Sequence, residues 1–514
     1  MSADGSVGGV SSPSVVIIGS GFGGLGMAHA LKQQGIESFT ILEKARDLGG
    51  VWRENTYPGA ACDVPSHLYS FSFEPHYPWS CRYGKQAEIL GYMQHVASKY
   101  DLRRHIRFGC EVQGADYDET AGLWRVRLAG GEVLECNVLV SAVGQLHQPQ
   151  IPQIPGLENF KGRAFHSARW DHGFDFRNKT VAVIGTGPSA VQLVPELAKE
   201  VKQLYLYQRS PGWCVPKFDR PYRTWERRLL DKVPLLYDLD RWRVFWTIEF
   251  LNSGLVRQPV VGSAAKVFLH LSAAALMRLQ VRKPALRKQL TPDFAIGCKR
   301  TLLSNDWLRV LALPQVKVVS EGVQEATAGG IRSGDGKLRE VDAVIFGTGF
   351  ASTEFLAPIE MRGRGGQSLR QRWKDGADAY LGMSVSGFPN LYVLYGPNTN
   401  VGAGSIIYML EQQARYVAQA AALLRDRGLR SLEVRDESQC EYNAMLRQRS
   451  ERSVYESGCH SWYITADGRN TNTWVGYMNE YARLVRKPRL EHYVQVPGQV
   501  PSTTAAGEAQ AIAS

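Results

Sequence analysis

Two glycine-rich turns have the residue types and the spacing that bind a dinucleotide. In the first, the run VVIIGSGFGGLG places Gly19, Gly21 and Gly24 between an expected buried strand and an expected helix. Such a turn lets the backbone approach a pyrophosphate, whose charge lies against the helix N-terminus. Glu43 ends the next apolar run nineteen residues after Gly24, where a carboxylate can accept hydrogen bonds from ribose hydroxyls. The pattern predicts an adenine dinucleotide site.

The second turn, in VAVIGTGPSAVQLV, contains Gly185, Gly187 and Ala190. The apolar run that follows, QLYLYQRS, ends in Arg209 rather than in an acid. A carboxylate at this position would repel a ribose 2′-phosphate, whereas a guanidinium can bind it through two parallel hydrogen bonds. We therefore predict NADPH at the second turn and FAD at the first.

Two such turns require two parallel sheets that are covered by helices. Apolar runs at 134–145 and 339–350 each lead into a small-residue turn, and we expect these strands to return the chain to the first unit. The predicted fold is α/β, with two Rossmann-like dinucleotide-binding domains and a helical insertion, the NADPH domain being inserted into a discontinuous FAD domain. The predicted ranges are a disordered tail (1–14), the first part of the FAD domain (15–148), the NADPH domain (149–340, with the helical insertion at about 222–290), the second part of the FAD domain (341–495) and a second disordered tail (496–514).

Two further stretches flank these turns. FKGRAFHSARWD spaces Phe160, Gly162, His166, Trp170 and Asp171 just before the second turn, and GGVWRENTYPGAACD (49–63) follows the first. They resemble two signatures of the flavin-dependent (type I) Baeyer–Villiger monooxygenases, a branch of the flavoprotein monooxygenase family: F-x-G-x-x-x-H-x-x-x-W-[PD], and G-G-x-W with Y-P-G-x-x-x-D. The similarity extends from about residue 15 to 480, apart from the helical insertion.

The resemblance implies an FAD-containing, NADPH-dependent enzyme that inserts one oxygen atom of O2 next to a ketone carbonyl and yields an ester or lactone. By the same resemblance, Arg300 of the Lys-Arg pair in CKRTLLSND is the catalytic cation that stabilises a peroxyflavin, and Asp63 orients it. Phe160, Gly162, His166, Trp170 and Asp171 are expected to couple the two domains, with His166 as a supporting residue rather than a general base. The implied FAD-binding residues are Gly19, Gly21, Phe22, Gly24, Glu43, Gly50, Trp52, Asp63 and Tyr69, and the NADP-binding residues are Gly185, Gly187, Ser189, Ala190, Arg209, Lys299 and Trp462.

Several alternatives stay open. Trp462 in GCHSWY is either an aromatic wall near the nicotinamide ribose or an ordinary core tryptophan, and GPNTNVG (396–402) is a candidate border of the substrate cavity. A flavin monooxygenase that forms N-oxides or S-oxides would use the same cofactors, so a sulfide or amine could replace the ketone. An NADPH-dependent flavin oxidoreductase would not insert oxygen. The eight cysteines include no C-x-x-C pair, which argues against a dithiol redox centre or a cysteine metal site.

Composition excludes other classes. The net charge is +11, but the sequence has no compact basic run interleaved with aromatics, so we expect no nucleic-acid partner. Binding of the anionic cofactors accounts for part of the excess of basic residues. No stretch approaches eighteen apolar residues and the first residues lack a signal-peptide pattern, which predicts a cytoplasmic protein without stable membrane insertion. The basic, amphipathic segment 222–290 could rest on a membrane surface, but a helical lid packed on its own protein is favoured. We predict no metal, and the oligomeric state is not predicted.

Overall fold

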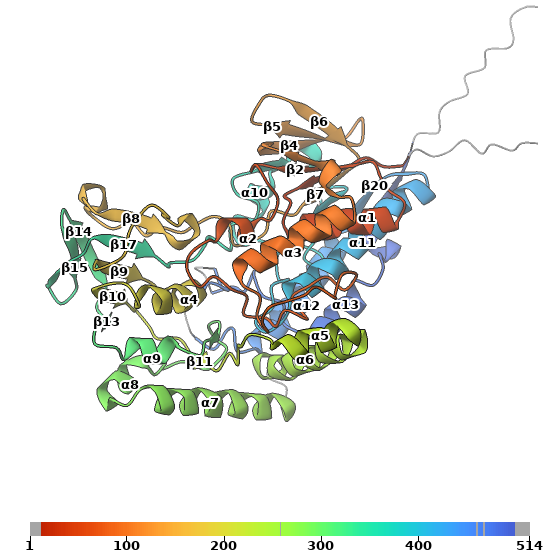
Figure 1. Ribbon diagram of the computed structural model, residues 1–514. Helices are drawn as coiled ribbons and strands as arrows, with labels where there is room; N and C mark the ends of the chain where they lie inside the picture. Colours follow the sequence, from red (N-terminus) through yellow and green to blue (C-terminus); the bar gives the residue numbers. More distant parts are fainter. Residues whose placement is uncertain (1–11, 257–258, 459–460, 466–467, 499–514) are drawn as a thin grey trace, which may run out of the picture.

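The computed structural model describes residues 12–256, 259–458, 461–465 and 468–498, and contains two parallel five-stranded sheets (Figure 1). Their orders are β19–β7–β1–β2–β3 and β13–β10–β9–β17–β8. In both sheets the central strand leads into a predicted glycine turn, so the predicted α/β fold with two Rossmann-like units is confirmed. The first sheet comprises β1 (Val15–Ile18), β2 (Phe39–Glu43), β3 (Ile106–Phe108), β7 (Val138–Ser141) and β19 (Leu391–Val393), and the second comprises β8 (Arg163–His166), β9 (Thr180–Ile184), β10 (Gln203–Tyr207), β13 (Val316–Val319) and β17 (Ala343–Phe346).

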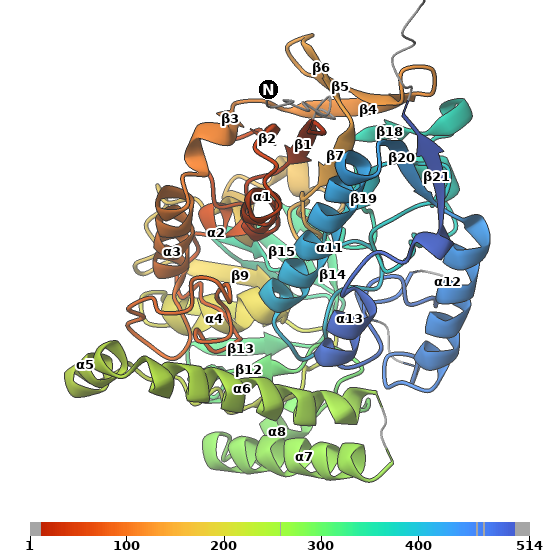
Figure 2. The ribbon, with the colours of Figure 1, turned by 90° about the vertical axis from the view of Figure 1, so that its right-hand side faces the viewer.

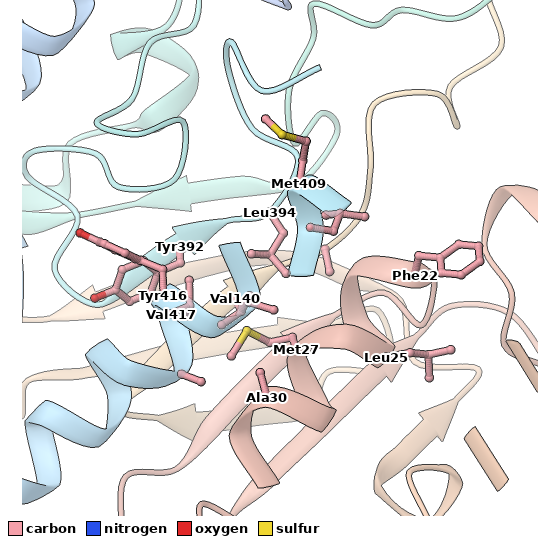
Figure 3. Close-up of a cluster of buried hydrophobic side chains, with 14 of the residues drawn as sticks. Phe22, Leu25, Met27, Ala30, Val140, Tyr392, Leu394, Met409, Tyr416 and Val417 are labelled. Atoms are coloured by element: carbon pink, nitrogen blue, oxygen red, sulfur yellow. The ribbon is translucent and has the colours of Figure 1, made fainter. Parts of the chain in front are cut away.

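The first sheet is held by a core that joins distant parts of the chain. Helix α1 (Phe22–Gln33) packs against α11 (Ile406–Asp426) beside the sheet, and Figure 3 shows side chains of both helices meeting those of β7 and β19. Leu25, Met27 and Val417 are fully buried there, and each such burial stabilises the fold by about 1.5–3 kcal/mol. This packing fixes the turn between β1 and α1, where the first nucleotide site is expected.

The second sheet contains a strand that the sequence assigned to the wrong unit. Strand β17 (Ala343–Phe346) pairs with β9 and β8 of the second sheet, whereas residues from 341 onward were expected in the FAD domain. All four β17 side chains are buried, and a fully buried apolar strand carries no sign of which sheet it joins. The chain therefore leaves the second sheet only after Phe346.

The two crossings between the sheets lie next to each other. Pro149 on the outgoing segment forms a bridge with Phe350 on the returning one. Gln150 N donates to Gly349 O at 2.9 Å, and Ala351 N donates to Gln148 O at 3.0 Å. These backbone bonds join the two crossings into one paired connection.

Four helices fill the segment that was expected as a helical insertion. They are α5 (Thr224–Lys232), α6 (Pro234–Leu255), α7 (Val261–Gln280) and α8 (Pro284–Leu290), and α6 and α7 pack on each other along the lower border of the molecule in both views (Figures 1 and 2). Among the described residues, no helix combines the length and the apolar character needed to cross a bilayer. The other helices are α2 (Val51–Glu54), α3 (Gln86–Lys99), α4 (Pro188–Leu197), α9 (Trp307–Leu311), α10 (Leu369–Arg372), α12 (Asp436–Glu451) and α13 (Met478–Leu484).

Small sheets and the chain ends complete the fold. Within the expected first tail, Ser14 N donates to Asn137 Oδ1 at 2.9 Å. The second tail was expected from residue 496, but β21 continues through Val496 to Pro497. These two residues pair with Ser431 and Leu429 of β20. Residues 1–11 and 499–514 lie outside the described part. The remaining strands are β4 (Val112–Asp118), β5 (Leu123–Leu128), β6 (Val133–Cys136), β11 (Cys214–Val215), β12 (Leu302–Leu303), β14 (Val323–Thr327), β15 (Gly330–Ser333), β16 (Leu338–Glu340), β18 (Glu360–Arg362), β20 (Leu429–Val434) and β21 (Tyr493–Pro497).

Candidate active site

The first glycine turn forms a cradle at the edge of the first sheet. A β-carbon at Gly24 would overlap the carbonyl oxygen of Gly19, so only glycine lets α1 start this close to β1. A cavity opens above this contact, and Gly24 itself lies beneath it. The predicted residues that line the cavity are Gly19, Gly21, Phe22, Glu43, Gly50, Trp52 and Tyr69.

Glu43 lies at the end of β2, buried in the wall of this first cavity. Its Oε2 accepts hydrogen bonds from Ser20 N at 3.0 Å and Ser20 Oγ at 2.7 Å, and its Oε1 accepts one from Ala45 N at 3.0 Å. These bonds fix an acceptor beside the glycine turn. The backbone cradle and the fixed carboxylate fit the pyrophosphate and ribose of a dinucleotide.

A second cavity, of about 1020 Å³, joins the two sheets. Trp52 and Tyr69 line both cavities, and Trp52 Nε1 donates to Tyr69 Oη at 3.0 Å. From there the second cavity extends to the second glycine turn. The predicted residues on its wall are Asp63, Gly185, Gly187, Ser189, Arg209, Arg300 and Trp462, whereas Ala190 lies buried behind the turn.

Two cations converge at the end of the second cavity that holds this turn. Lys299 Nζ donates to Ser210 Oγ at 2.8 Å, next to Arg209 in the chain. Burial and the nearby charge of Arg209 lower the pKa of Lys299, so the two cations are close enough to repel each other. Neither forms a salt bridge with a carboxylate among the described residues. The charge of Asp293 acts on Lys299 in the opposite direction, but its effect on the pKa is smaller than those of burial and Arg209. Two neighbouring cations fit a dianionic phosphate, as the 2′-phosphate of NADP would supply.

Arg300 and Asp63 meet in the middle of the same cavity. Arg300 donates to Asp63 Oδ2 from Nη2 at 2.6 Å and from Nε at 3.1 Å, and both side chains are about one quarter exposed to the cavity. The charge of Asp63 raises the pKa of Arg300. Burial is the largest single effect on the pKa of Asp63 and would raise it, but the charge and hydrogen bonds of Arg300, together with the charge of Lys217, hold this pKa below the usual value. The pair is therefore fully ionised at neutral pH.

Three tyrosines surround Arg300, and sequence reasoning missed them. Tyr395, Tyr455 and Tyr463 lie close enough for the positive charge of Arg300 to influence their pKa values, although burial, the larger effect, raises all three. Tyr395 also lines both cavities. Isolated tyrosines carry no spacing signal, but Tyr395 directly precedes the loop 396–402, whose residues Asn400 and Val401 line the second cavity as expected of a border.

The segment that carries Asp63 packs on α4 of the second sheet. Tyr57 Oη donates to Gln192 Oε1 at 3.0 Å, and Gln192 Nε2 donates to Ala61 O at 2.9 Å. A β-carbon at Gly59 would lie only 2.6 Å from Gln192 O. The Y-P-G part of the motif is thus a close contact between the segment of the first nucleotide site and the second unit, and it places Asp63 opposite Arg300.

The other signature lies at the edge of the second sheet, outside both cavities. His166 ends β8, is buried, and its Nδ1 accepts a hydrogen bond from Ala168 N at 3.1 Å. Its ring contacts Phe350 on the paired crossing, with centroids 5.5 Å apart, and burial lowers its pKa. Trp170 packs edge-on against Phe165. Gly162 packs between the Phe160 ring and the residue that precedes β17. Asp171 Oδ2 lies 3.8 Å from Arg163 Nε.

Trp462 lines the second cavity, and its carbonyl accepts a hydrogen bond from Ser352 Oγ at 3.1 Å. Its ring lies against that of Tyr463, with centroids 4.6 Å apart. It is therefore partly buried and also faces the cavity. Over the described part of the chain, no three His, Cys, Asp or Glu side chains come together as a metal site would require.

Comparisons with known proteins agree with this geometry. Residues 12–232 match the family model described as flavin-binding monooxygenase-like. A Baeyer–Villiger monooxygenase of Pseudomonas aeruginosa is 42% identical over 475 residues, which is 92% of this chain and 89% of the relative. A Baeyer–Villiger monooxygenase of Streptomyces coelicolor is 41% identical over 500 residues, 97% of this chain and 95% of the relative.

Solved structures with the same fold contain the two expected cofactors. An oxidised steroid monooxygenase bound to NADP superposes with a TM-score of 0.83 at 31% identity, over 95% of this chain and 100% of that one. A complex of OTEMO with FAD and NADP gives a TM-score of 0.82 at 28% identity, with the same coverage. From these relatives and the two dinucleotide cavities it follows that the chain belongs to the Baeyer–Villiger monooxygenases, FAD- and NADPH-dependent enzymes that insert an oxygen atom of O2 next to a ketone carbonyl.

Proposed function

We propose that Arg300 is the catalytic cation of this monooxygenase and that Asp63 is its positioning residue. The observation that carries the proposal is the Arg300–Asp63 ion pair in a cavity that both nucleotide sites share. No other carboxylate of the described chain pairs with this guanidinium.

We further propose the cofactor contacts. FAD, which supplies hydride acceptance and O2 activation when bound, is held by Gly19, Gly21, Phe22, Gly24, Glu43, Gly50, Trp52, Asp63 and Tyr69. NADPH is held by Gly185, Gly187, Ser189, Ala190, Arg209, Lys299 and Trp462. The lining of the first cavity supports the FAD contacts other than Gly24, which lies beneath the turn, and Asp63, which lines the second cavity with Trp52 and Tyr69. The lining of the second cavity and the bond from Lys299 to Ser210 beside Arg209 support the NADPH contacts, with Ala190 behind the turn.

The role of Arg300 follows from its charge. A guanidinium stays protonated at every pH at which the enzyme works, and Asp63 raises its pKa further. When a ketone carbonyl is attacked, negative charge develops on its oxygen, and a fixed cation within reach stabilises that charge more than it stabilises the neutral ketone. The bond to Asp63 holds the guanidinium in place, so little reorganisation is needed. The tyrosines around Arg300 exclude water, which strengthens the interaction.

His166, Trp170 and the rest of the signature act as support in this proposal. A buried imidazole with a lowered pKa is neutral at pH 7, and it contacts the paired crossing instead of a cavity. It can therefore transmit the position of the second unit to the crossing but does not transfer a proton to the substrate.

The proposed substrate is a ketone with an apolar body, because Trp462, Val401 and Ile406 contribute apolar side chains to the wall of the second cavity. A sulfide or an amine is the alternative substrate. We also propose that the enzyme works in the cytoplasm, where NADPH is supplied.

The test compares Arg300→Ala with the matched control Arg177→Ala, whose side chain pairs with Asp175 on the surface. Rapid mixing measures flavin reduction by NADPH, and mass analysis measures ester from a panel of linear, cyclic and aryl ketones. We expect the Arg300 variant to reduce its flavin but to lose ester formation by at least about a hundredfold, as when a donor to a developing oxyanion is removed. Ester formation at the rate of the control would refute the role. Sulfoxide formation from thioanisole without any ester from the unaltered enzyme would favour the alternative substrate class.

A further inference from the structure

Helices α5 to α7 expose an unusual share of the apolar surface. Of the eighteen large hydrophobic side chains that are exposed among the described residues, fourteen lie between residues 225 and 279. Scattered exposed apolar side chains are normal in a protein, but a contiguous group on packed helices marks an interaction site. The helices that carry this group lie in the lower part of the molecule in Figure 2.

The exposed side chains form one stripe along each long helix. On α6 they are Leu235, Leu239, Trp242, Trp246 and Phe250, spaced by three or four residues, so they share one face over four turns. Trp242 and Trp246 are 64% and 46% exposed, and their rings contact each other at 6.4 Å.

Helix α7 carries apolar side chains on its solvent side as well as on its inner face. Its inner face buries Ala265, Leu269, Ala273 and Leu276 against the protein, while Phe268, Leu271 and Leu279 on the other side are 53%, 65% and 79% exposed. Ser263, His270 and Arg278 are exposed on the same helix, so its solvent side is mixed, with large apolar side chains beside polar ones. Phe268, Leu271 and Leu279 are therefore exposed apolar side chains on the solvent side of α7.

The same segment is strongly basic. Between residues 222 and 290 the sequence has thirteen lysines and arginines and five aspartates and glutamates, a net charge of +8 of the chain's +11. Arg227 and Arg228 on α5 and Arg278, Arg282 and Lys283 at the end of α7 are exposed, and none of these five forms a salt bridge with a carboxylate in the described part of the chain.

The acidic residues of this segment are mostly occupied within the protein. Glu226 accepts from Arg220 and Asp240 from Arg243, and buried Glu249 accepts from Asn479 N at 2.9 Å. The surface that α5–α7 presents is thus apolar and cationic.

We propose that this surface docks on an anionic phospholipid membrane, with the apolar stripes in the headgroup region and the cations at the phosphates. Lysines and arginines beside an amphipathic helix with exposed tryptophan and leucine are the features of helices that lie in the interface. The proposed contact is with the membrane surface, in the plane in which such helices lie. A second copy of the chain would bring the same positive charge against this face, so charge favours the lipid. The proposal is independent of the role of Arg300.

Flotation with vesicles tests the proposal on the full FAD-loaded chain. We expect the protein to float with vesicles that contain phosphatidylglycerol at least tenfold more than with phosphatidylcholine alone, and added salt should weaken this binding. Trp242→Glu with Leu271→Glu should abolish flotation, and Arg278→Glu with Lys283→Glu should reduce it. Val133→Glu and Leu338→Glu, at exposed apolar positions on the small sheets, should float like the unaltered protein.

Three results would overturn the proposal. One is no flotation with anionic vesicles, and another is equal flotation of the stripe variants and the controls. The third is a dimer in sedimentation that Trp242→Glu dissociates while vesicles bind nothing, since a second copy would then be the partner. Bound FAD and NADPH oxidation, measured on every variant, show whether each one is folded, and Trp246→Glu provides a second stripe variant if Trp242→Glu does not fold.

Discussion

The cation pair at the second turn gives a prediction that separates NADPH from NADH. Removing either Lys299 or Arg209 takes away one positive charge from the place where a 2′-phosphate would lie, whereas NADH has no phosphate there. Lys299→Met keeps most of the side-chain length and Arg209→Ala removes the guanidinium. Both variants should lose NADPH preference and keep their flavin, because neither residue lines the first cavity.

The magnitude follows from one lost hydrogen bond to a charged group, about 1.5–3 kcal/mol. At 1.36 kcal/mol for each factor of ten, the preference for NADPH over NADH should fall about 10- to 150-fold for each single variant. The two losses should not add, because the charge of Arg209 lowers the pKa of Lys299 in the unaltered protein and the two cations therefore interact.

The assay is the KM for NADPH and for NADH in each single variant and in the double variant, with Lys199→Met, at an exposed lysine paired with Glu196, as control. The pH dependence gives a second readout. Since the pKa of Lys299 is lowered, the lysine loses its charge at a lower pH than an ordinary lysine, so the KM for NADPH should rise as pH increases through that pKa, while the KM for NADH stays flat. In Arg209→Ala the rise should move to higher pH. Equal losses with both nucleotides would show that the cations do not contact the phosphate.

Two further predictions concern stability and flavin binding. His29 stacks on Phe73, and burial, with the charge of Arg415 nearby, lowers its pKa to about 4. Below pH 6.5 the imidazole is therefore protonated in the unfolded chain but stays neutral in the folded one, so lowering the pH from 7 to 5 should reduce the free energy of unfolding by about 2 kcal/mol. Urea unfolding measures this loss, which should be absent in His29→Phe. Gly24→Ala should yield protein with little bound flavin, because its β-carbon overlaps the Gly19 carbonyl, at a cost of about 1–3 kcal/mol. The control Gly130→Ala, whose β-carbon would lie in open space, should bind flavin normally. A Gly24 variant with full flavin occupancy would contradict the role of this turn in binding the cofactor.

Much of the nucleotide-binding architecture was predictable because its constraints are local. Gly24 must be glycine for a steric reason within six residues of chain, and Glu43 and Arg209 end strands whose apolar runs are visible in the sequence. The turns, the α/β class and the order of the two units follow from such patterns.

What could not be predicted depends on contacts between distant segments. The sheet that Ala343–Phe346 joins is decided by packing against β9 and β8, and four buried apolar residues fit either sheet. The tyrosines around Arg300 come from two separate loops and have no spacing relation to it. The α7 sequence looks like a core helix, because composition cannot tell an apolar face that packs inside from one that is exposed.

The contact between the Tyr57–Asp63 segment and α4 limits how this enzyme can be recombined with its relatives. Suppose that the NADPH domain is moved into a relative to change coenzyme use, with a junction at residue 149. The hybrid would then receive Gln192 and Arg300 without their partners Ala61 and Asp63, which lie before the junction. Residues 57–63 must therefore be transferred together with the NADPH domain, although more than eighty residues of chain separate residue 63 from the junction. In this architecture, an exchange that changes the coenzyme preference also changes the position of the Arg300 guanidinium unless the segment 57–63 is exchanged with it.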